Sequence, residues 1–335
     1  MRICVLGAGG LGSVFGGFLA REGADVTLVG RPAHVQAIRD NGLQLVGIRG
    51  EHTVRNITAV AHPDEAEGDF DYLILGVKGK DTQTALESAN HLRDRVACAF
   101  SFQNNVVKEQ VLADWLGDRS RVIGFSTIEA GLLEAPGRVN NNFTVDTTNY
   151  IGELDGNTSQ RVQAMADMFN AIGMNTRVMQ NIEQVIWEKL TQIANAAGAS
   201  ISLLIGNPTL HVADAMSPRE GAEHYVSVAR DLLSIYKGLG YTPQNFFAPV
   251  SRLKELDGAT DFEDAVAMVM QIGETMQNNK YRGRTSMHED ILRGRKTEVE
   301  FILGPFMEQS QKLDIPIPTA AACYRIIKLL DRHLA

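Results

Sequence analysis

The sequence predicts a chain of two parts, an α/β domain built on a parallel sheet and an all-helical domain after it. Short apolar runs rich in Val, Ile and Leu, with helical patterns between them, indicate strands buried on both faces in the first part. Strand patterns stop near residue 180, and long stretches of helical periodicity follow. We therefore expect one domain at 1–180 and a second at 181–335.

A glycine-rich turn opens the first domain. An apolar run at 2–6 stops at Gly7, and the next residues complete the pattern G-x-G-x-x-G: Gly7, Ala8, Gly9, Gly10, Leu11 and Gly12. A helical pattern continues to Gly23, and 26–29 reads as a second strand. This order is what a dinucleotide-binding, Rossmann-type unit requires. We expect Gly7 to permit the turn, Gly9 to admit a pyrophosphate, and Gly12 to let the helix pack on the strand.

The end of the second predicted strand indicates which dinucleotide is bound. NAD-binding units carry an acidic residue about twenty residues after the glycines, for the ribose 2′-hydroxyl. This chain has Gly30 and Arg31 there, with Arg39 further on. A guanidinium pairs well with a 2′-phosphate, whereas a carboxylate would repel it. We predict NADP(H) as the cofactor, with a solvated surface role as the alternative for Arg31.

Composition excludes several classes of function. The 335 residues are 44% hydrophobic and 21% charged, which is ordinary for a globular protein. A net charge of −8 argues against a nucleic acid or an anionic membrane as partner. Three cysteines stand far apart with no C-x-x-C pair, so we expect neither a metal site nor disulfides. With no signal peptide or membrane span in the pattern, we expect a cytoplasmic enzyme.

The remaining elements are predicted from periodicity and turn residues. Residues 43–48 and 53–59 read as a hairpin-like pair, 138–152 as an antiparallel pair, and Asp81-Thr82 as a helix cap. Further strands are expected at 71–77, 95–102, 121–127 and 174–179. Helices are expected at 33–41, 158–172, 182–204, 222–239, 262–276, 297–313 and 320–334.

Two polar residues follow buried strands of the predicted sheet. Lys78 comes after 71–77, and Asn104 comes after 95–102. Ligands of open parallel sheets bind outside the carboxyl ends of the strands, so both are candidate binding residues. The alternatives are a surface lysine and a turn-forming asparagine.

Two clusters in the helical part could carry chemistry. Lys189 stands in a largely uncharged segment, and burial would lower its pKa towards the range useful for a general acid. A lysine that extends from the helix edge to water is an equally good interpretation. The second cluster holds Ser286 and Glu298. From the residues alone, a helix cap at Thr285 or Ser286 and solvated charges is the better interpretation.

These motifs together resemble the ketopantoate reductase (2-dehydropantoate 2-reductase) family, in order and across nearly the whole chain. The similar segments are GAGGLG at 7–12, the strand end at Lys78, QNN at 103–105, APG at 135–137, YIG at 150–152, WEKL at 187–190, TSMHEDILRGRKTEVEFILG at 285–304 and IPIPT at 315–319. The resemblance implies a helical domain of the 6-phosphogluconate dehydrogenase C-terminal type. It also implies NADPH-dependent reduction of a 2-oxo acid to a D-2-hydroxy acid.

The resemblance also implies roles for individual residues. Lys189 would be the general acid that protonates the carbonyl oxygen, where it would also stabilise the developing charge. Lys78 and Asn104 would lie beside the nicotinamide and the reacting carbonyl. Ser286 would bind the substrate carboxylate, and Glu298 would orient the substrate hydroxyl or Lys189. The favoured reaction is reduction of 2-dehydropantoate to (R)-pantoate, in pantothenate and coenzyme A biosynthesis.

One departure from the family concerns the substrate. The family usually carries Asn one and two turns after the lysine, where this chain has Ile193 and Ala197. Asn195 lies about 120° away from the lysine face, whereas Gln192 and Ser200 lie nearer to it and could bind substrate instead. Without those amides, discrimination for a hydroxylated substrate should be weak. The alternative is therefore a reductase of another branched or aromatic 2-oxo acid.

Other classes of protein fit the sequence less well. Hydroxyisobutyrate and 6-phosphogluconate dehydrogenases combine similar domains but usually carry a second glycine-rich motif, which we do not find here. A non-catalytic NADP-sensing protein is a further alternative, against which Lys189, Ser286 and Glu298 argue. We expect a small-molecule substrate, no nucleic-acid or membrane partner, and a homodimer.

Overall fold

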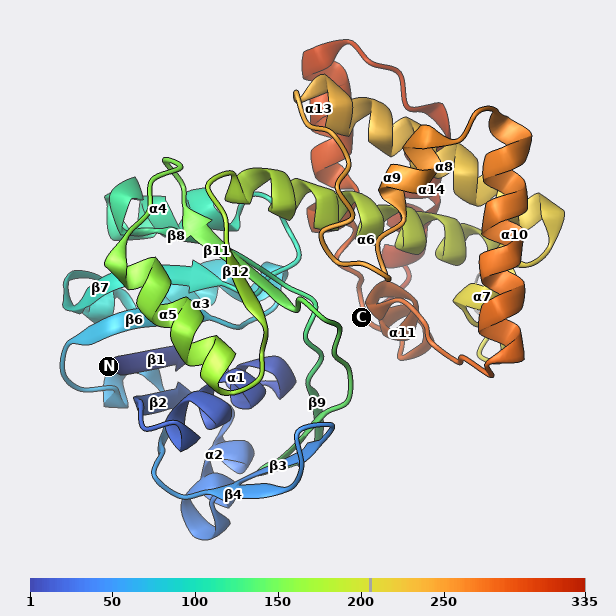
Figure 1. Cartoon of the computed structure of the whole chain (residues 1–335). Coiled ribbons are helices and arrows are strands. Elements are labelled where there is room, and N and C mark those ends of the chain that lie inside the picture. Colours follow the sequence, from blue (N-terminus) through green and yellow to red (C-terminus); the bar gives the residue numbers. More distant parts are fainter. Residues whose placement is uncertain (205–206, 335) are drawn as a thin grey trace. The chain divides into compact units, whose positions relative to one another are not determined.

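The computed structural model describes residues 1–204 and 207–334. The chain divides into two compact units, Met1–Ile186 and Trp187–Ala335, and each is described by itself (Figure 1). The N-terminal unit is built on a parallel sheet and the C-terminal unit is helical in its described residues, which confirms the predicted fold class.

The central sheet of the N-terminal unit has five parallel strands in the order β5-β2-β1-β6-β7. Its strands are β1 (Arg2–Leu6), β2 (Asp25–Val29), β5 (Thr58–Val60), β6 (Phe70–Leu75) and β7 (Val96–Ser101). Leu6 pairs with Leu75 and Leu75 with Ser101, so β1, β6 and β7 end side by side. The turns that follow these three strands therefore share one edge of the sheet.

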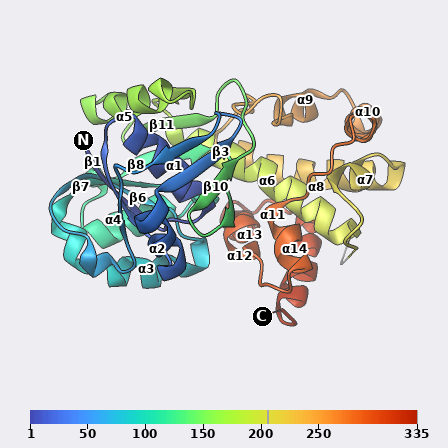
Figure 2. The same ribbon diagram turned by 90° about the horizontal axis from the view of Figure 1, so that it is seen from below.

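Helices cover both faces of this sheet (Figure 2). One face packs against α1 (Gly10–Arg21), α2 (Pro32–Asn41) and α5 (Gln160–Ala171), and the other against α3 (Thr82–Ser88) and α4 (Lys108–Leu116). Alternate strand residues divide between the two cores, since neighbouring side chains of a strand point to opposite faces. Phe15 of α1 packs against Phe102 with ring centroids 4.3 Å apart, which fixes α1 on the sheet.

Two smaller sheets complete this unit. One has the order β4-β3-β10-β9 and the other β12-β11-β8. Their strands are β3 (Leu43–Gly47), β4 (His52–Val54), β8 (Ile123–Thr127), β9 (Leu132–Ala135), β10 (Arg138–Asn141), β11 (Asn149–Glu153) and β12 (Thr176–Val178). Short 3-10 helices lie at Pro63–Glu65, Gly79–Asp81, Asn90–Arg95 and Arg119–Arg121.

Three local predictions for this unit were wrong. The run 53–59 is not one strand: β4 pairs with β3, whereas β5 joins the central sheet. The predicted antiparallel pair at 138–152 is also wrong, because β10 and β11 belong to different sheets. Asp81 makes no side-chain cap, since it belongs to a 3-10 turn that leads directly into α3. The predicted end of α1 near Gly23 is confirmed, with Gly23 at φ +93°.

The C-terminal unit contains the longest helix, α6 (Ile182–Leu204), which begins in the N-terminal unit. The other helices are α7 (Val212–Met216), α8 (Arg219–Gly238), α9 (Leu253–Gly258), α10 (Phe262–Asn278), α11 (Ser286–Leu292), α12 (Val299–Ile302), α13 (Gly304–Leu313) and α14 (Pro318–Asp331). The predicted helix 297–313 is two helices, because Pro305 lacks an N–H and restarts the helix in the first turn of α13.

Candidate active site

The glycine turn after β1 has the geometry that a dinucleotide pyrophosphate needs. Gly7 has φ +113°, and a Cβ atom there would lie 2.6 Å from the backbone nitrogen of Val77. A Cβ at Gly12 would overlap the carbonyl oxygen of Gly7. A Cβ at Gly9 would meet nothing within 4 Å. Gly7 and Gly12 are therefore required by the fold itself, whereas the space in front of Gly9 fits a phosphate facing the amides of α1.

Arg31 lies at the end of β2, where the ribose of the adenosine would lie. It is exposed and forms the N-cap position of α2. Backbone N–H groups of Gly7 and Ala8 both donate to the carbonyl of Val29, which ties this strand end to the glycine turn. Arg39 has a structural role: its Nε donates to the carbonyl of Ala59, and its Nη2 lies 3.0 Å from Glu65. Arg31 is thus the better placed of the two for a 2′-phosphate.

Lys78 and Asn104 lie at the carboxyl edge of adjacent strands. Lys78 is exposed after β6, and Asn104 is half-buried after β7. Gln103, which belongs to the QNN motif but was not predicted as a site residue, joins the two turns: its Nε2 donates to the carbonyl of Val77 (2.9 Å) and to Thr82 Oγ1 (2.6 Å). The structure therefore brings Lys78 and Asn104 to the same edge as the glycine turn.

His34 is a second residue that sequence reasoning missed. It is 3% exposed, its Nδ1 accepts the backbone N–H of Gly137 (2.9 Å), and its Nε2 lies 2.9 Å from Ser13 Oγ of α1. Because Nδ1 is the acceptor, the neutral ring carries its hydrogen on Nε2 and donates to Ser13. Burial lowers the pKa of His34 below its usual 6.5. This imidazole therefore fastens the 135–137 turn to the glycine-turn helix.

Helix α6 carries Lys189 on a partly exposed stripe. Lys189, Gln192, Ile193 and Ala196 are all half-buried and fall on one face at about 100° per residue. Ser200 and Ala197 are 1% and 0% exposed. Gln192 Oε1 and Ser200 Oγ are buried and have no hydrogen-bond partner among the described residues. Gln192 thus lies beside Lys189 with a side-chain oxygen that can accept a hydrogen bond, whereas Ser200 and Ala197 are more deeply buried.

Glu188, next to the lysine, lies about 100° away from it around the helix and was not predicted as a site residue. It is 1% exposed, and its carboxylate accepts the Tyr236 hydroxyl (3.1 Å) and the backbone N–H groups of Gln244 (2.8 Å) and Phe246 (2.9 Å). Burial raises the pKa of Glu188, and these hydrogen bonds oppose the rise. Glu188 therefore fixes the rotation of the α6 turn that carries Lys189.

Ser286 and Glu298 lie at the starts of two short helices. Thr285 Oγ1 accepts the N–H of His288, so the predicted cap of α11 is confirmed at Thr285 and Ser286 is the first residue of the helix. Glu298 is half-buried immediately before α12, and its carbonyl accepts the N–H groups of Phe301 (2.9 Å) and Ile302 (3.0 Å). The start of α11 is therefore held by the Thr285 cap, and the start of α12 by backbone hydrogen bonds to the Glu298 carbonyl.

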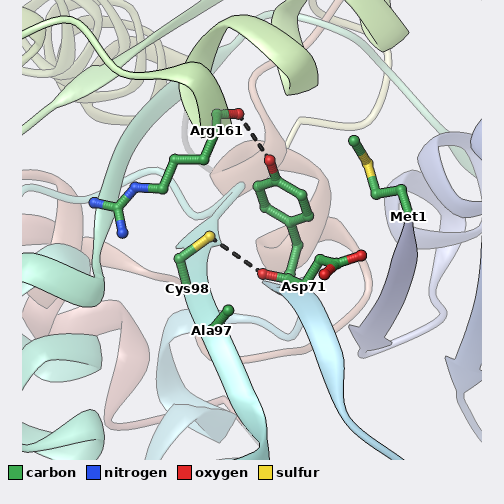
Figure 3. Close-up of a pocket in the computed structure, with 6 residues that line it drawn as sticks. Met1, Asp71, Ala97, Cys98 and Arg161 are labelled. Carbon is green, nitrogen blue, oxygen red and sulfur yellow. Dashed lines mark hydrogen bonds between the residues drawn. The ribbon is translucent and has the colours of Figure 1, made fainter.

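A pocket of about 230 Å³ lies at the other edge of the central sheet (Figure 3). Its lining residues lie at the starts of β1, β6 and β7 and on helix α5: Met1, Asp71, Tyr72, Ala97, Cys98 and Arg161. The Tyr72 hydroxyl donates to the carbonyl of Arg161, and Cys98 Sγ to that of Asp71. Burial raises the pKa of Cys98 to about 12, so its thiol stays protonated. This pocket lies at the amino ends of the strands, away from the glycine turn.

No helix in the described ranges is long and apolar enough to cross a membrane. Nor do the described side chains include a group of three or more His, Cys, Asp or Glu residues placed to hold a metal ion.

The fold and the glycine turn together define a two-domain, dinucleotide-dependent oxidoreductase. Residues 3–156 match the family model described as ketopantoate reductase PanE/ApbA, and residues 181–331 match its C-terminal model. The chain belongs to the ketopantoate reductase family, whose members are NADP-dependent oxidoreductases.

Named relatives cover almost the whole chain. This chain is 29% identical over 330 residues to a 2-dehydropantoate 2-reductase of Pyrococcus abyssi, and the match covers 98% of this chain and 97% of the relative. It is 27% identical over 333 residues to the enzyme of that name from Halobacterium salinarum, covering 99% of each.

Solved structures share the fold. A PanE/ApbA family ketopantoate reductase from Ralstonia eutropha JMP134 superposes with a TM-score of 0.79 at 23% identity, covering 99% of both chains. A D-mandelate dehydrogenase in complex with NADH gives a TM-score of 0.76 at 19% identity, covering all of both chains. The family match and the named relatives confirm the predicted family, enzyme class and cofactor.

Proposed function

We propose that this chain reduces a 2-oxo acid to the corresponding 2-hydroxy acid, and that 2-dehydropantoate is its favoured substrate. NADPH, when bound, supplies the hydride. In this proposal the domain at 1–180 holds the cofactor with residues 7–12, Arg31, Lys78 and Asn104. The domain at 181–335 supplies Lys189 as general acid, Ser286 for the substrate carboxylate and Glu298 for orientation.

The observation that carries the proposal is the stripe on α6. Lys189 is half-buried there, one turn from a Gln192 oxygen that is buried and has no hydrogen-bond partner among the described residues. A buried acceptor without a partner costs free energy, so it is expected to meet a donor from a ligand. A substrate hydroxyl is such a donor. A cation at the same stripe stabilises the oxygen that becomes an alkoxide.

A second substrate class is favoured by the other residues of the stripe. Ile193 and Ala196 are half-buried beside Lys189, so the wall they form is apolar. An apolar wall would accept the side chain of a branched or aromatic 2-oxo acid as well as the hydroxylated one. We therefore keep such an acid as the alternative substrate.

The test measures oxidation of NADPH with 2-dehydropantoate, a branched 2-oxo acid and an aromatic 2-oxo acid. We expect Lys189→Ala to lower kcat by about 10²- to 10⁴-fold and to leave NADPH binding unchanged. Gln192→Leu should weaken turnover of 2-dehydropantoate more than that of the apolar acids. Equal losses for all three acids would contradict the role of Gln192. Undiminished turnover by Lys189→Ala would contradict the proposed mechanism.

The cofactor residues have their own test. Charge-assisted hydrogen bonds contribute about 1.5 to 3 kcal/mol, so Arg31→Ala should reduce the preference for NADPH over NADH by roughly ten- to a hundredfold. Lys80, which is exposed two residues after Lys78, offers a matched control. Lys78→Ala should weaken turnover, and Lys80→Ala should not. Equal losses of turnover in the two variants would show that Lys78 is not a site residue.

A homodimer and a cytoplasmic location remain part of the proposal. The dimer is tested by light scattering of the purified chain, and a monomer at micromolar concentration would contradict it. Fractionation of cells that produce the chain tests the location.

A further inference from the structure

The C-terminal helix α14 contacts the segment that carries Glu298 on both sides of this residue. We propose that α14 is a positioning element for Glu298, with Asp331 as its main positioning residue and Tyr324 and Lys328 as lesser ones. This inference rests on the proposed function, in which the Glu298 carboxylate orients the substrate or Lys189.

Asp331 holds the residue before Glu298. Thr297 is 8% exposed; its backbone N–H donates to one carboxylate oxygen of Asp331 and its hydroxyl to the other, both at 2.9 Å. The same hydroxyl oxygen accepts the N–H of Val299 (3.3 Å). Hydrogen bonds to a charged acceptor are the stronger kind, and two from one residue fix its distance and its orientation. The backbone entering Glu298 is therefore set by a residue 34 positions later.

A weaker pair of contacts holds the other side. Glu300 accepts the Tyr324 hydroxyl (2.7 Å) and pairs with the Lys328 ammonium, both on α14. The Glu300 and Lys328 side chains are 50% and 42% exposed, so water screens the pair and its contribution is small. Asp331 therefore carries most of the positioning.

Helix α14 is itself anchored at its other end. Asp231 of α8 accepts the N–H groups of Thr319 (2.7 Å) and Ala320 (3.0 Å), which caps α14. Cys323 and Ile327 are fully buried in the middle of the helix. Because α14 is held at its start and in its middle, its last turn, which carries Asp331, also has a fixed position. Asp331 thus fixes the position of the Glu298 backbone relative to the core of this unit.

The test uses variants with matched controls. Asp331→Ala removes both hydrogen bonds to residue 297 and Thr297→Val removes the one from the hydroxyl, whereas Thr297→Ser and a chain that ends at Asp331 keep both. We expect the first two to lower kcat about tenfold with NADPH binding unchanged, since a small misplacement of a catalytic group costs up to about 10²-fold. The two controls should stay within about twofold of the wild type. If Asp331 acts through Glu298, Asp331→Ala should add almost nothing in a Glu298→Gln background.

Hydrogen exchange supplies a readout that does not depend on turnover. In Asp331→Ala, the amides of 297–302 should exchange faster while α8 and α10 stay protected. Unchanged exchange at 297–302, or faster exchange throughout the unit, would overturn the proposal. So would an undiminished effect of Asp331→Ala in the Glu298→Gln background. A wild type that reduces no 2-oxo acid would overturn the proposed function, while local exchange at 297–302 would still support the contact.

Discussion

The two units hold their candidate residues by different means. In the N-terminal unit the glycine turn, Lys78 and Asn104 follow strands β1, β6 and β7, and backbone ladders set their positions. In the C-terminal unit, side-chain bonds between distant residues set the positions: Glu188 binds residues 48 to 58 positions away, and Thr297 binds Asp331. Backbone geometry leaves a local signature in a sequence, whereas a distant side-chain partner does not.

Removing the Glu188 carboxylate should have the largest effect. Glu188→Ala leaves the buried Tyr236 hydroxyl and two partly buried backbone N–H groups unpaired, which should cost about 3 kcal/mol of unfolding free energy. Urea denaturation measures this loss. Glu183→Ala is the control on the same helix, because its pair with Arg119 has both side chains 49% exposed and should contribute less than about 1 kcal/mol. Equal losses would mean that the buried contacts add nothing.

Two glycine variants test whether the N-terminal unit depends on its backbone in the expected way. Gly12→Ala should cost about 1 to 3 kcal/mol, because its Cβ would overlap the Gly7 carbonyl. Gly9→Ala should leave the melting temperature nearly unchanged, since its Cβ meets no atom within 4 Å. It should still weaken NADPH binding about tenfold or more by occupying the phosphate space. A destabilised Gly9→Ala variant with normal NADPH binding would contradict this division of roles.

The accuracy of the sequence predictions follows the same division. The strand, glycine turn and helix at residues 2–21 were predictable because each residue's role is local, and the described range of α6 matches the prediction. The run 53–59 was not, because only its partners decide that β4 and β5 join different sheets. The helix break before Pro305 was missed, although a proline inside a helical pattern was a usable signal.

The residues of the candidate site also divide into those that could be predicted from the sequence and those that could not. The family resemblance supplied Lys189, Ser286 and Glu298, for which the residues alone left plainer alternatives. Gln103 and Glu188 belong to the QNN and WEKL motifs, but nothing in the sequence indicated their contacts or those of His34, because their partners lie 21 to 103 residues away. Their types are ordinary, and only burial and contact distinguish them. Polar residues that tie elements together are the part that sequence patterns could not supply.

Two matched helix caps compare the units directly. Ser159 caps α5 in the N-terminal unit, and Thr285 caps α11 in the C-terminal unit. Ser159→Ala and Thr285→Ala should each cost about 1 kcal/mol of unfolding free energy, the usual loss for such a cap. Only Thr285→Ala should raise KM for the 2-oxo acid, because Ser286 is the next residue. A raised KM in both variants would show that the effect is general destabilisation.

The smallest expected effect is the pH dependence that His34 contributes. Because burial lowers the pKa of His34 in the folded chain, the unfolded chain binds a proton more readily. The neutral ring's contribution is therefore complete above about pH 6.5 and falls as the pH drops below it. His34→Gln keeps an acceptor and a donor without titrating. The melting temperature of the wild type relative to His34→Gln should fall between about pH 7.5 and about pH 5.5.

The His34→Gln variant is needed because other histidines also make the folded chain less stable in acid. Burial also lowers the pKa of His224 and His288 in the C-terminal unit, so the wild type alone cannot assign the effect. The difference between wild type and His34→Gln cancels their contribution. A difference that stays constant with pH would mean that His34 does not link Ser13 to Gly137 through a neutral ring. A difference that grows in acid would show that the cofactor-binding helix, too, depends on one distant side-chain contact.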